Sequence, residues 1–382
     1  RVLAVAVVGS VGLGALTKVR PGVPPRPEVP HLRVAVVQTN VPSSNKVDWT
    51  LEERIETFRR LVQMTDEAAG AKPDLIVWPE TMFPGYSLSD DAMNLARVFP
   101  DSPYFIVMRE LLLEVQASLG VPMLVGSVGV EGVRFEESTG TVEAERIYNS
   151  VFLLEGGEVR GRYDKIHLTP FGEVMPYISA FDWLERLLLV LGAPGMSFDL
   201  DAGAGPVHFE VRTSTGEMVR VVTPICFEAT DGRVCRRLVT AAEGDADLII
   251  NVTNDGWFGS SDAGRRHHAL LGRWRAAELG VPVIRAANTG ISGLIPAGGG
   301  PGGFVDMELG ARTEGVLVAD VVLGRERETL YRRTGNVVGV ACALSLLIFL
   351  PVACWRGRAA AQGERPGDTM VKEASRKEPD GS

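Results

Sequence analysis

Three side chains with complementary chemistry stand where apolar runs of the sequence end. Glu80 brings a carboxylate, Lys165 an amine and Cys226 a thiol. A thiol is a good nucleophile only as its thiolate and needs a base beside it. A carboxylate in an apolar pocket can have its pKa raised to act as that base, and an ammonium can stabilise an oxyanion. Each residue alone is a weak signal, since a lone cysteine is more often a buried small hydrophobe, but together they predict covalent acyl transfer.

These residues lie 85 and 61 positions apart, so only tertiary folding can bring them together. Short β-branched runs that alternate with longer amphipathic stretches supply the elements. Strands are expected over residues 32–37, 74–78, 121–125, 219–223, 247–252 and 281–285, with a β-rich stretch over 147–162. Helices are expected over 51–69, 102–119, 231–243 and 262–279. This order predicts a layered α/β domain whose reactive groups lie at strand ends.

Composition excludes several classes of function. The 39 Lys and Arg against 48 Asp and Glu leave a net charge of −9, without the basic footprint of a nucleic-acid-binding protein. The 4 cysteines are scattered and form no CxxC pair, so neither a zinc site nor a disulfide framework is expected. The 5 histidines include one adjacent pair, which does not favour a metal site. We therefore expect no metal and no other cofactor.

Both ends of the chain have the composition of membrane segments. Residues 334–355 are uncharged and bordered by arginines, close to the roughly 20 residues that span a bilayer, which favours a transmembrane helix over a buried core helix. Residues 1–17 are expected to be the end of another transmembrane helix, with a signal peptide as the alternative. A proline-rich linker follows over 18–30. Residues 31–330 form the catalytic domain, and the polar tail over 356–382 is expected to be disordered.

The three reactive residues lie in motifs of a known superfamily. The sequences Trp78-Pro79-Glu80, Tyr163-Asp164-Lys165 and Ile225-Cys226-Phe227-Glu228 resemble the carbon–nitrogen hydrolase (nitrilase) superfamily, whose Glu-Lys-Cys triad occurs in this chain order. The resemblance implies a nitrilase-like four-layer α-β-β-α sandwich. It also implies that Glu80 is the general base and then acid, that Lys165 stabilises the oxyanion and that Cys226 is the nucleophile.

Four further motifs resemble the apolipoprotein N-acyltransferase branch of that superfamily. They are Pro170–Glu173, Asn254–Gly259, Asn288–Gly290 and Tyr331–Asn336, the last standing directly before the C-terminal apolar run. This resemblance implies that Cys226 takes an acyl group from a phospholipid as a thioester. The N-terminal amine of an S-diacylglyceryl-cysteine apolipoprotein then accepts it. The implied enzyme is a monomer of the bacterial inner membrane, with its catalytic domain on the outer (periplasmic) face.

The branch implies roles for four more residues. Glu173 and Glu228 match further essential carboxylates and are expected to orient Lys165 and assist the base, although Glu173 could instead be a structural salt-bridge partner. Trp257 matches a tryptophan near the substrate, with a packed core aromatic as the alternative. Phe227 stands where the family often has Tyr, so a hydroxyl that could position a substrate is absent.

Two segments depart from a soluble enzyme of this superfamily. The branch carries a bundle of N-terminal transmembrane helices, of which residues 1–17 look like the last remnant. The apolar stretch over 174–198 is interpreted as an arm that dips into the lipid surface, with an ordinary core helix as the alternative. A membrane-tethered amidase or nitrilase is the first competing function, and a binding module on an inactive scaffold is the second.

Overall fold

The computed structural model describes residues 30–41, 50–94, 104–136, 141–170, 172–173, 200–241, 244–298, 308–323 and 329–363. The chain divides into two compact units, Arg1–Thr329 and Leu330–Ser382. The predicted N-terminal membrane segment over 1–17, the linker up to residue 29 and the arm over 174–198 lie outside the described residues.

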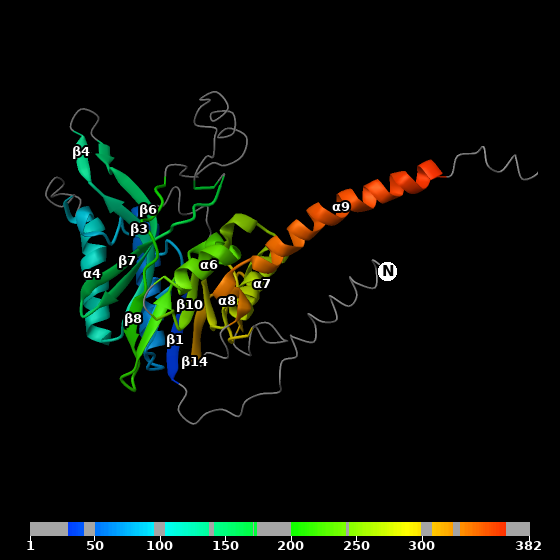
Figure 1. Cartoon of the computed structure of the whole chain (residues 1–382). Coiled ribbons are helices and arrows are strands. Elements are labelled where there is room, and N and C mark those ends of the chain that lie inside the picture. The colour runs from blue at the N-terminus through cyan, green and yellow to red at the C-terminus, as the bar shows by residue number, and fades with distance from the viewer. Residues whose placement is uncertain are drawn as a thin grey trace, which may run out of the picture. The chain divides into compact units, whose positions relative to one another are not determined.

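The first unit contains two larger sheets and a small hairpin within its described part (Figure 1). The first sheet has the order β14-β1-β2-β3-β6-β7, formed by Gly315–Val322, His31–Gln38, Leu75–Trp78, Met123–Glu131, Arg146–Glu155 and Glu158–Asp164. The second has the order β13-β12-β11-β10-β9-β8, formed by Glu308–Leu309, Ser292–Ile295, Val283–Ala287, Leu248–Thr253, Met218–Val222 and Phe209–Arg212. The hairpin joins β4 (Arg134–Glu136) to β5 (Thr141–Glu143). Each larger sheet has three parallel strands at its centre, β1-β2-β3 and β9-β10-β11.

Helices cover the outer face of each sheet, and the inner faces meet. Helices α2 (Leu51–Ala69) and α4 (Tyr104–Leu119) share one hydrophobic core with β1 and β2, in which Ala35 and Val37 take part. Helices α6 (Gly232–Val239) and α7 (Asp262–Leu279) lie on the far side of the second sheet (Figure 1). Between the sheets, the Ser292 hydroxyl of β12 donates to Gln38 Oε1 of β1 at 2.5 Å. The four-layer α-β-β-α prediction is confirmed.

The apolar pattern follows from this layering. All four residues of β2 and all six of β10 are buried, as expected of parallel strands covered on both faces. Helix α2 begins at Leu51 as predicted because Thr50 and Glu53 form a capping box at its N-terminus. The predicted strands and helices are all present, with boundaries shifted by a few residues. Strand β8, strands β12–β14 and the β4–β5 hairpin were missed.

The second unit contains α8 (Leu330–Thr334) and α9 (Val337–Gly363). Among the described residues, α9 alone is long and apolar enough to cross a membrane, with a mean hydropathy of 2.6 over Val337–Cys354. The helix continues to Gly363, so the prediction of disorder was wrong for residues 356–363. Three consecutive alanines there have the highest helix propensity of any residue and extend the helix beyond the apolar run.

Candidate active site

Glu80 lies just beyond the end of β2 and is buried. Its Oε1 accepts a hydrogen bond from Asn149 Nδ2 at 2.7 Å, and its Oε2 accepts one from the backbone N–H of Asn254 at 2.7 Å. The neighbouring strand β3 carries Gly126, where a Cβ would lie 2.1 Å from the Pro79 carbonyl oxygen. Only glycine therefore lets the chain that carries Glu80 pass so close to β3.

Lys165 follows β7 and is almost fully buried among acidic groups. Its Nζ lies 2.6 Å from Glu173 Oε2 and donates to Thr169 Oγ1 at 3.2 Å. Burial alone would lower the pKa of Lys165, but electrostatic interactions with Cys226, Glu80 and Glu173 outweigh burial and raise it. The amine is therefore a permanent cation at neutral pH, as an oxyanion partner must be.

Glu173 is held as the counter-charge of this amine. Burial would raise the pKa of Glu173, but the charge of Lys165 outweighs burial and lowers it. Its Oε2 also accepts from the Thr169 backbone N–H at 2.9 Å, and its Oε1 accepts from Asn149 Nδ2 at 2.9 Å. A carboxylate that orients Lys165 has to contact its amine, and Glu173 makes that contact.

Cys226 is the first residue of the short helix η3 (Cys226–Thr230), which follows β9. Its φ of 49° places a non-glycine residue in the left-handed region, a strained conformation of the kind that clusters at active sites. The preceding residue, Ile225, pairs with Val252 of β10, so the second sheet fixes the start of the turn. Cys226 as a whole residue is half-buried, and its thiol is free.

Burial and the charge of Glu80 raise the pKa of the Cys226 thiol to about 12, although Lys165 acts in the opposite direction. The resting group is therefore a thiol at neutral pH, and a base must remove its proton during the reaction. We expect the rate of Cys226 alkylation by iodoacetamide to rise steadily between pH 7 and pH 10, because only the thiolate reacts. Peptide mapping by mass spectrometry measures it, and a plateau below pH 8 would contradict this prediction.

The site therefore combines groups from both sheets. Glu80 and Lys165 leave the first sheet, and Cys226 leaves the second. The pKa of Cys226 responds to the charges of both other residues, so the three groups lie within electrostatic reach of one another. A base, a permanent cation and a thiol in one buried cluster can form and break an acyl thioester.

Comparison with known proteins assigns the family. Residues 33–331 match the family model described as carbon–nitrogen hydrolase. The chain belongs to the carbon–nitrogen hydrolase family. It is 32% identical over 310 residues to an apolipoprotein N-acyltransferase of Sinorhizobium medicae, covering 80% of this chain and 50% of that protein. It is 32% identical over 329 residues to one of Geobacter metallireducens, covering 84% and 53%. The chain thus spans about half the length of the curated relatives it matches.

Solved structures support the same fold. A crystal structure of an amidase from Nesterenkonia sp. matches with a TM-score of 0.51 at 18% identity, covering 78% of this chain and 94% of that chain. A mutant of that amidase, which matches equally well, shows covalent addition of the acetamide moiety of fluoroacetamide at its active-site cysteine. At this identity the likeness shows the nitrilase-superfamily fold alone.

Glu228 lies in a network of hydrogen bonds beside the site. Its carboxylate is fully buried and accepts hydrogen bonds from the Tyr163 hydroxyl and from the backbone N–H groups of Ile166, His167 and Ile225, at 2.8–3.0 Å. Burial raises the pKa of Glu228. The backbone bonds join the loop that follows Lys165 to the turn that carries Cys226.

The two aromatic residues singled out in the sequence are both exposed. Phe227, next to the thiol, is 44% exposed, and Trp257 is 55% exposed, so the alternative of a packed core aromatic does not hold for Trp257. A Cβ added to Gly172 would lie 3.2 Å from the Trp257 ring, so this ring borders the loop that carries Glu173. Both side chains are placed where an apolar substrate could contact them.

Sequence reasoning missed the supporting roles of three asparagines, of which Asn149 and the Asn254 backbone donate to the carboxylates and Asn288 holds Asn254. Asn149 of β6 bridges Glu80 and Glu173 through one Nδ2 atom. Asn254 donates to Glu80, and its own Oδ1 accepts from Asn288 Nδ2 at 3.1 Å. Asn254 and Asn288 lie in recognised motifs, but their role shows only in three dimensions. Asn149 follows an ordinary strand pattern, which gave no signal.

Proposed function

We propose that this chain is the catalytic part of an N-acyltransferase that moves a fatty acyl group from a phospholipid to the N-terminal amine of an S-diacylglyceryl-cysteine apolipoprotein. The buried cluster of Glu80, Lys165 and Cys226 carries the proposal. The choice of an apolipoprotein as acceptor is supported by relatives of 32% identity that are named apolipoprotein N-acyltransferase.

In the first half-reaction Glu80 takes the proton of the Cys226 thiol as sulfur attacks the ester carbonyl of the phospholipid. Lys165 stabilises the oxyanion. When the intermediate collapses, the carbon–oxygen ester bond breaks and Glu80 returns the proton to the leaving oxygen. The products are an acyl thioester on Cys226 and a lysophospholipid.

In the second half-reaction the amine of the acceptor attacks the thioester carbonyl. Glu80 accepts a proton from the amine, the carbon–sulfur bond breaks, and the thiolate of Cys226 recovers that proton. The product is an amide, and the enzyme is regenerated without a cofactor. Glu173 orients Lys165 throughout, and Glu228 fixes the two loops relative to each other. The exposed rings of Trp257 and Phe227 contact the substrates.

The proposed setting is the outer face of the bacterial inner membrane. The apolar helix over Val337–Cys354 supports a membrane attachment, because its length and hydropathy suit a bilayer. We propose that residues 334–355 span the membrane and that the domain over 31–330 works as a monomer on the periplasmic side. Both substrates are lipids or lipid-modified proteins, so such an attachment keeps the site near its donors.

A carbon–nitrogen hydrolase is the second candidate, favoured by the amidase fold of the solved relatives. The full chain in mixed micelles with radiolabelled phospholipid separates the two. We expect a hydroxylamine-labile label on Cys226 that persists in water and transfers to an added diacylglyceryl-cysteine lipopeptide. Release of the label as free fatty acid at the same rate with and without lipopeptide would identify a hydrolase instead. Absence of any label on Cys226 would reject both covalent mechanisms for this donor.

A further inference from the structure

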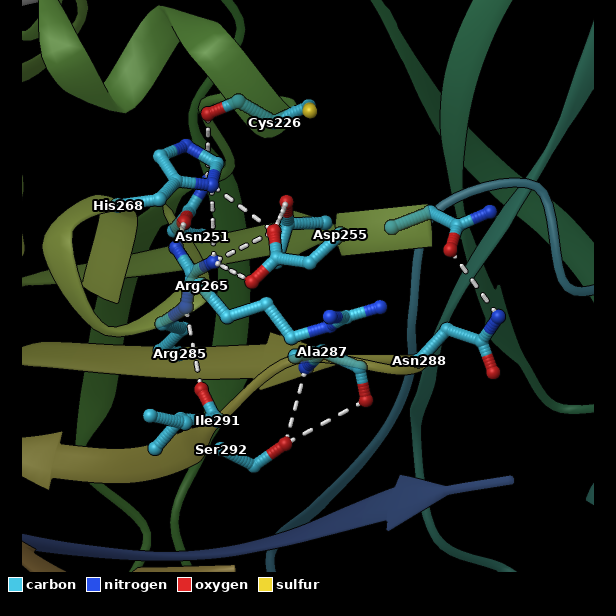
Figure 2. Close-up of polar contacts among 12 residues, drawn as sticks. Cys226, Asn251, Asp255, Arg265, His268, Arg285, Ala287, Asn288, Ile291 and Ser292 are labelled. Carbon is cyan, nitrogen blue, oxygen red and sulfur yellow. Dashed lines mark hydrogen bonds and ion pairs between the residues drawn. The ribbon is translucent and has the colours of Figure 1, made fainter. Parts of the chain in front are cut away.

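A buried ionic cluster of Asp255, His268 and Arg285 lies next to the turn that carries Cys226 (Figure 2). Arg285 Nη2 lies 2.8 and 2.7 Å from the two carboxylate oxygens of Asp255. Burial would raise the pKa of Asp255, but the charge of Arg285 and the contact with His268 outweigh burial and lower it. Burial and Arg285 lower the pKa of His268. The cluster is therefore one ion pair beside a neutral imidazole.

Asn251 connects this ion pair to the candidate nucleophile (Figure 2). Arg285 Nη1 donates to Asn251 Oδ1 at 2.8 Å, which fixes which end of the amide faces the arginine. Asn251 Nδ2 then donates to the carbonyls of Pro224 at 2.9 Å and Cys226 at 3.3 Å. These carbonyls lie on both sides of Ile225, so Asn251 holds the chain as it enters the strained turn.

The same arginine also holds the neighbouring loops. Its Nε donates to the Ile291 carbonyl at 3.1 Å, in the loop after β11. Asp255 begins the short helix η4 (Asp255–Phe258), which carries Trp257. A Cβ at Gly290 would lie 2.1 Å from Asp255 Oδ2, so the loop after β11 packs directly on this carboxylate. Arg285 thus links the loops that follow β9, β10 and β11.

We propose that Asn251, oriented by Arg285, is a positioning residue that sets the backbone of Cys226 for attack. The inference rests on the proposed role of Cys226 as nucleophile. Asn251 is 2% exposed, and Nε, Nη1 and Nη2 of Arg285 each have an acceptor inside the protein. These side chains act through the Cys226 backbone and do not contact a substrate.

Asn251→Asp is the sharpest test. Aspartate has the same shape and still accepts from Arg285, but as a carboxylate it cannot donate to the two carbonyls. In the full chain in mixed micelles, acylation of Cys226 by labelled phospholipid should become about 100-fold slower, the effect of a displacement near 1 Å. The concentration of phospholipid at half-maximal rate should stay unchanged, because the donor does not contact Asn251.

Cys235 reports whether the variant keeps its fold, because this thiol is 1% exposed. We expect it to stay as protected from iodoacetamide in Asn251→Asp as in the unsubstituted chain. Arg109→Met is the control. Arg109 is also a buried arginine that pairs with an aspartate, Asp90, at 2.5 Å, but it lies on helix α4, which packs on the first sheet. Its acylation rate should stay close to that of the unsubstituted chain.

Two outcomes would overturn the inference. One is an unchanged acylation rate in Asn251→Asp. The other is a slow rate accompanied by labelling of Cys235, which would show general loosening rather than positioning. A failure of the proposed function is seen separately, because the unsubstituted chain would then acquire no acyl label on Cys226 before any variant is compared.

Discussion

Replacing Glu80 with glutamine is expected to slow thioester formation on Cys226 by ~10²–10⁴-fold, the usual contribution of a positioned general base. Glutamine keeps the size of the side chain and cannot take a proton from the thiol. Its single oxygen can accept only one of the two hydrogen bonds that Asn149 and the Asn254 backbone donate to Glu80. The measurement is the single-turnover rate of label transfer from phospholipid to Cys226.

The same variant should make Cys226 more reactive toward iodoacetamide. Burial and the charge of Glu80 raise the pKa of this thiol, so removing that charge lowers the pKa and leaves more thiolate at a given pH. Slower acylation together with faster alkylation of Cys226, while the buried Cys235 stays unlabelled, separates loss of the base from general loosening of the fold. An acylation rate close to that of the unsubstituted chain would remove Glu80 from the mechanism.

Lys165→Met is expected to have the second large effect, on both stability and rate. The amine is 1% exposed and pairs with Glu173, so its loss leaves a buried carboxylate without its cation. Breaking such a pair costs about 3–5 kcal/mol of unfolding free energy. In the molecules that remain folded, loss of the oxyanion partner should slow acylation of Cys226 by ~10²–10³-fold. Urea unfolding followed by circular dichroism and the single-turnover assay measure the two effects.

The double variant Lys165→Met/Glu173→Gln separates these effects. Removing both charges should restore most of the stability, because no charge of the pair is then left buried, but acylation should stay slow. A double variant that regains the acylation rate would show that Lys165 is only structural.

The stability deficit of the single variant Lys165→Met should shrink as pH falls below about 4.5. There the unsubstituted chain loses the contribution of Glu173, whose pKa Lys165 lowers.

Much of the fold follows from the sequence because both central sheets contain strands that are apolar on both faces. Strands β2 and β10 read as short unbroken apolar runs, and α2 and α7 have the predicted bounds. The missed strands lack this signal. Strand β14 is buried at alternate positions near its end, and β13 has only two residues that pair with β12. Their pairing depends on tertiary neighbours rather than local pattern.

For the site, the residue types predict the chemistry but not the side chains that hold the reacting groups in place. The ends of the apolar runs that form β2, β7 and β9 predict Glu80, Lys165 and Cys226 as the reacting groups. Asn149 and Asn251 lie inside strands. In the sequence, nothing distinguishes a functional asparagine at such a position from an ordinary buried polar residue. What distinguishes them is which carboxylate or carbonyl lies opposite, and that is set by contacts between segments far apart in the chain.

The division of the three reactive groups between two sheets makes reactivity a test of correct assembly. A chain in which only the first sheet has formed holds a base and a cation but no thiol, and one in which only the second has formed holds a thiol with nothing to activate it. In the proposed mechanism, acyl transfer to Cys226 therefore requires that the two halves of the sandwich have met.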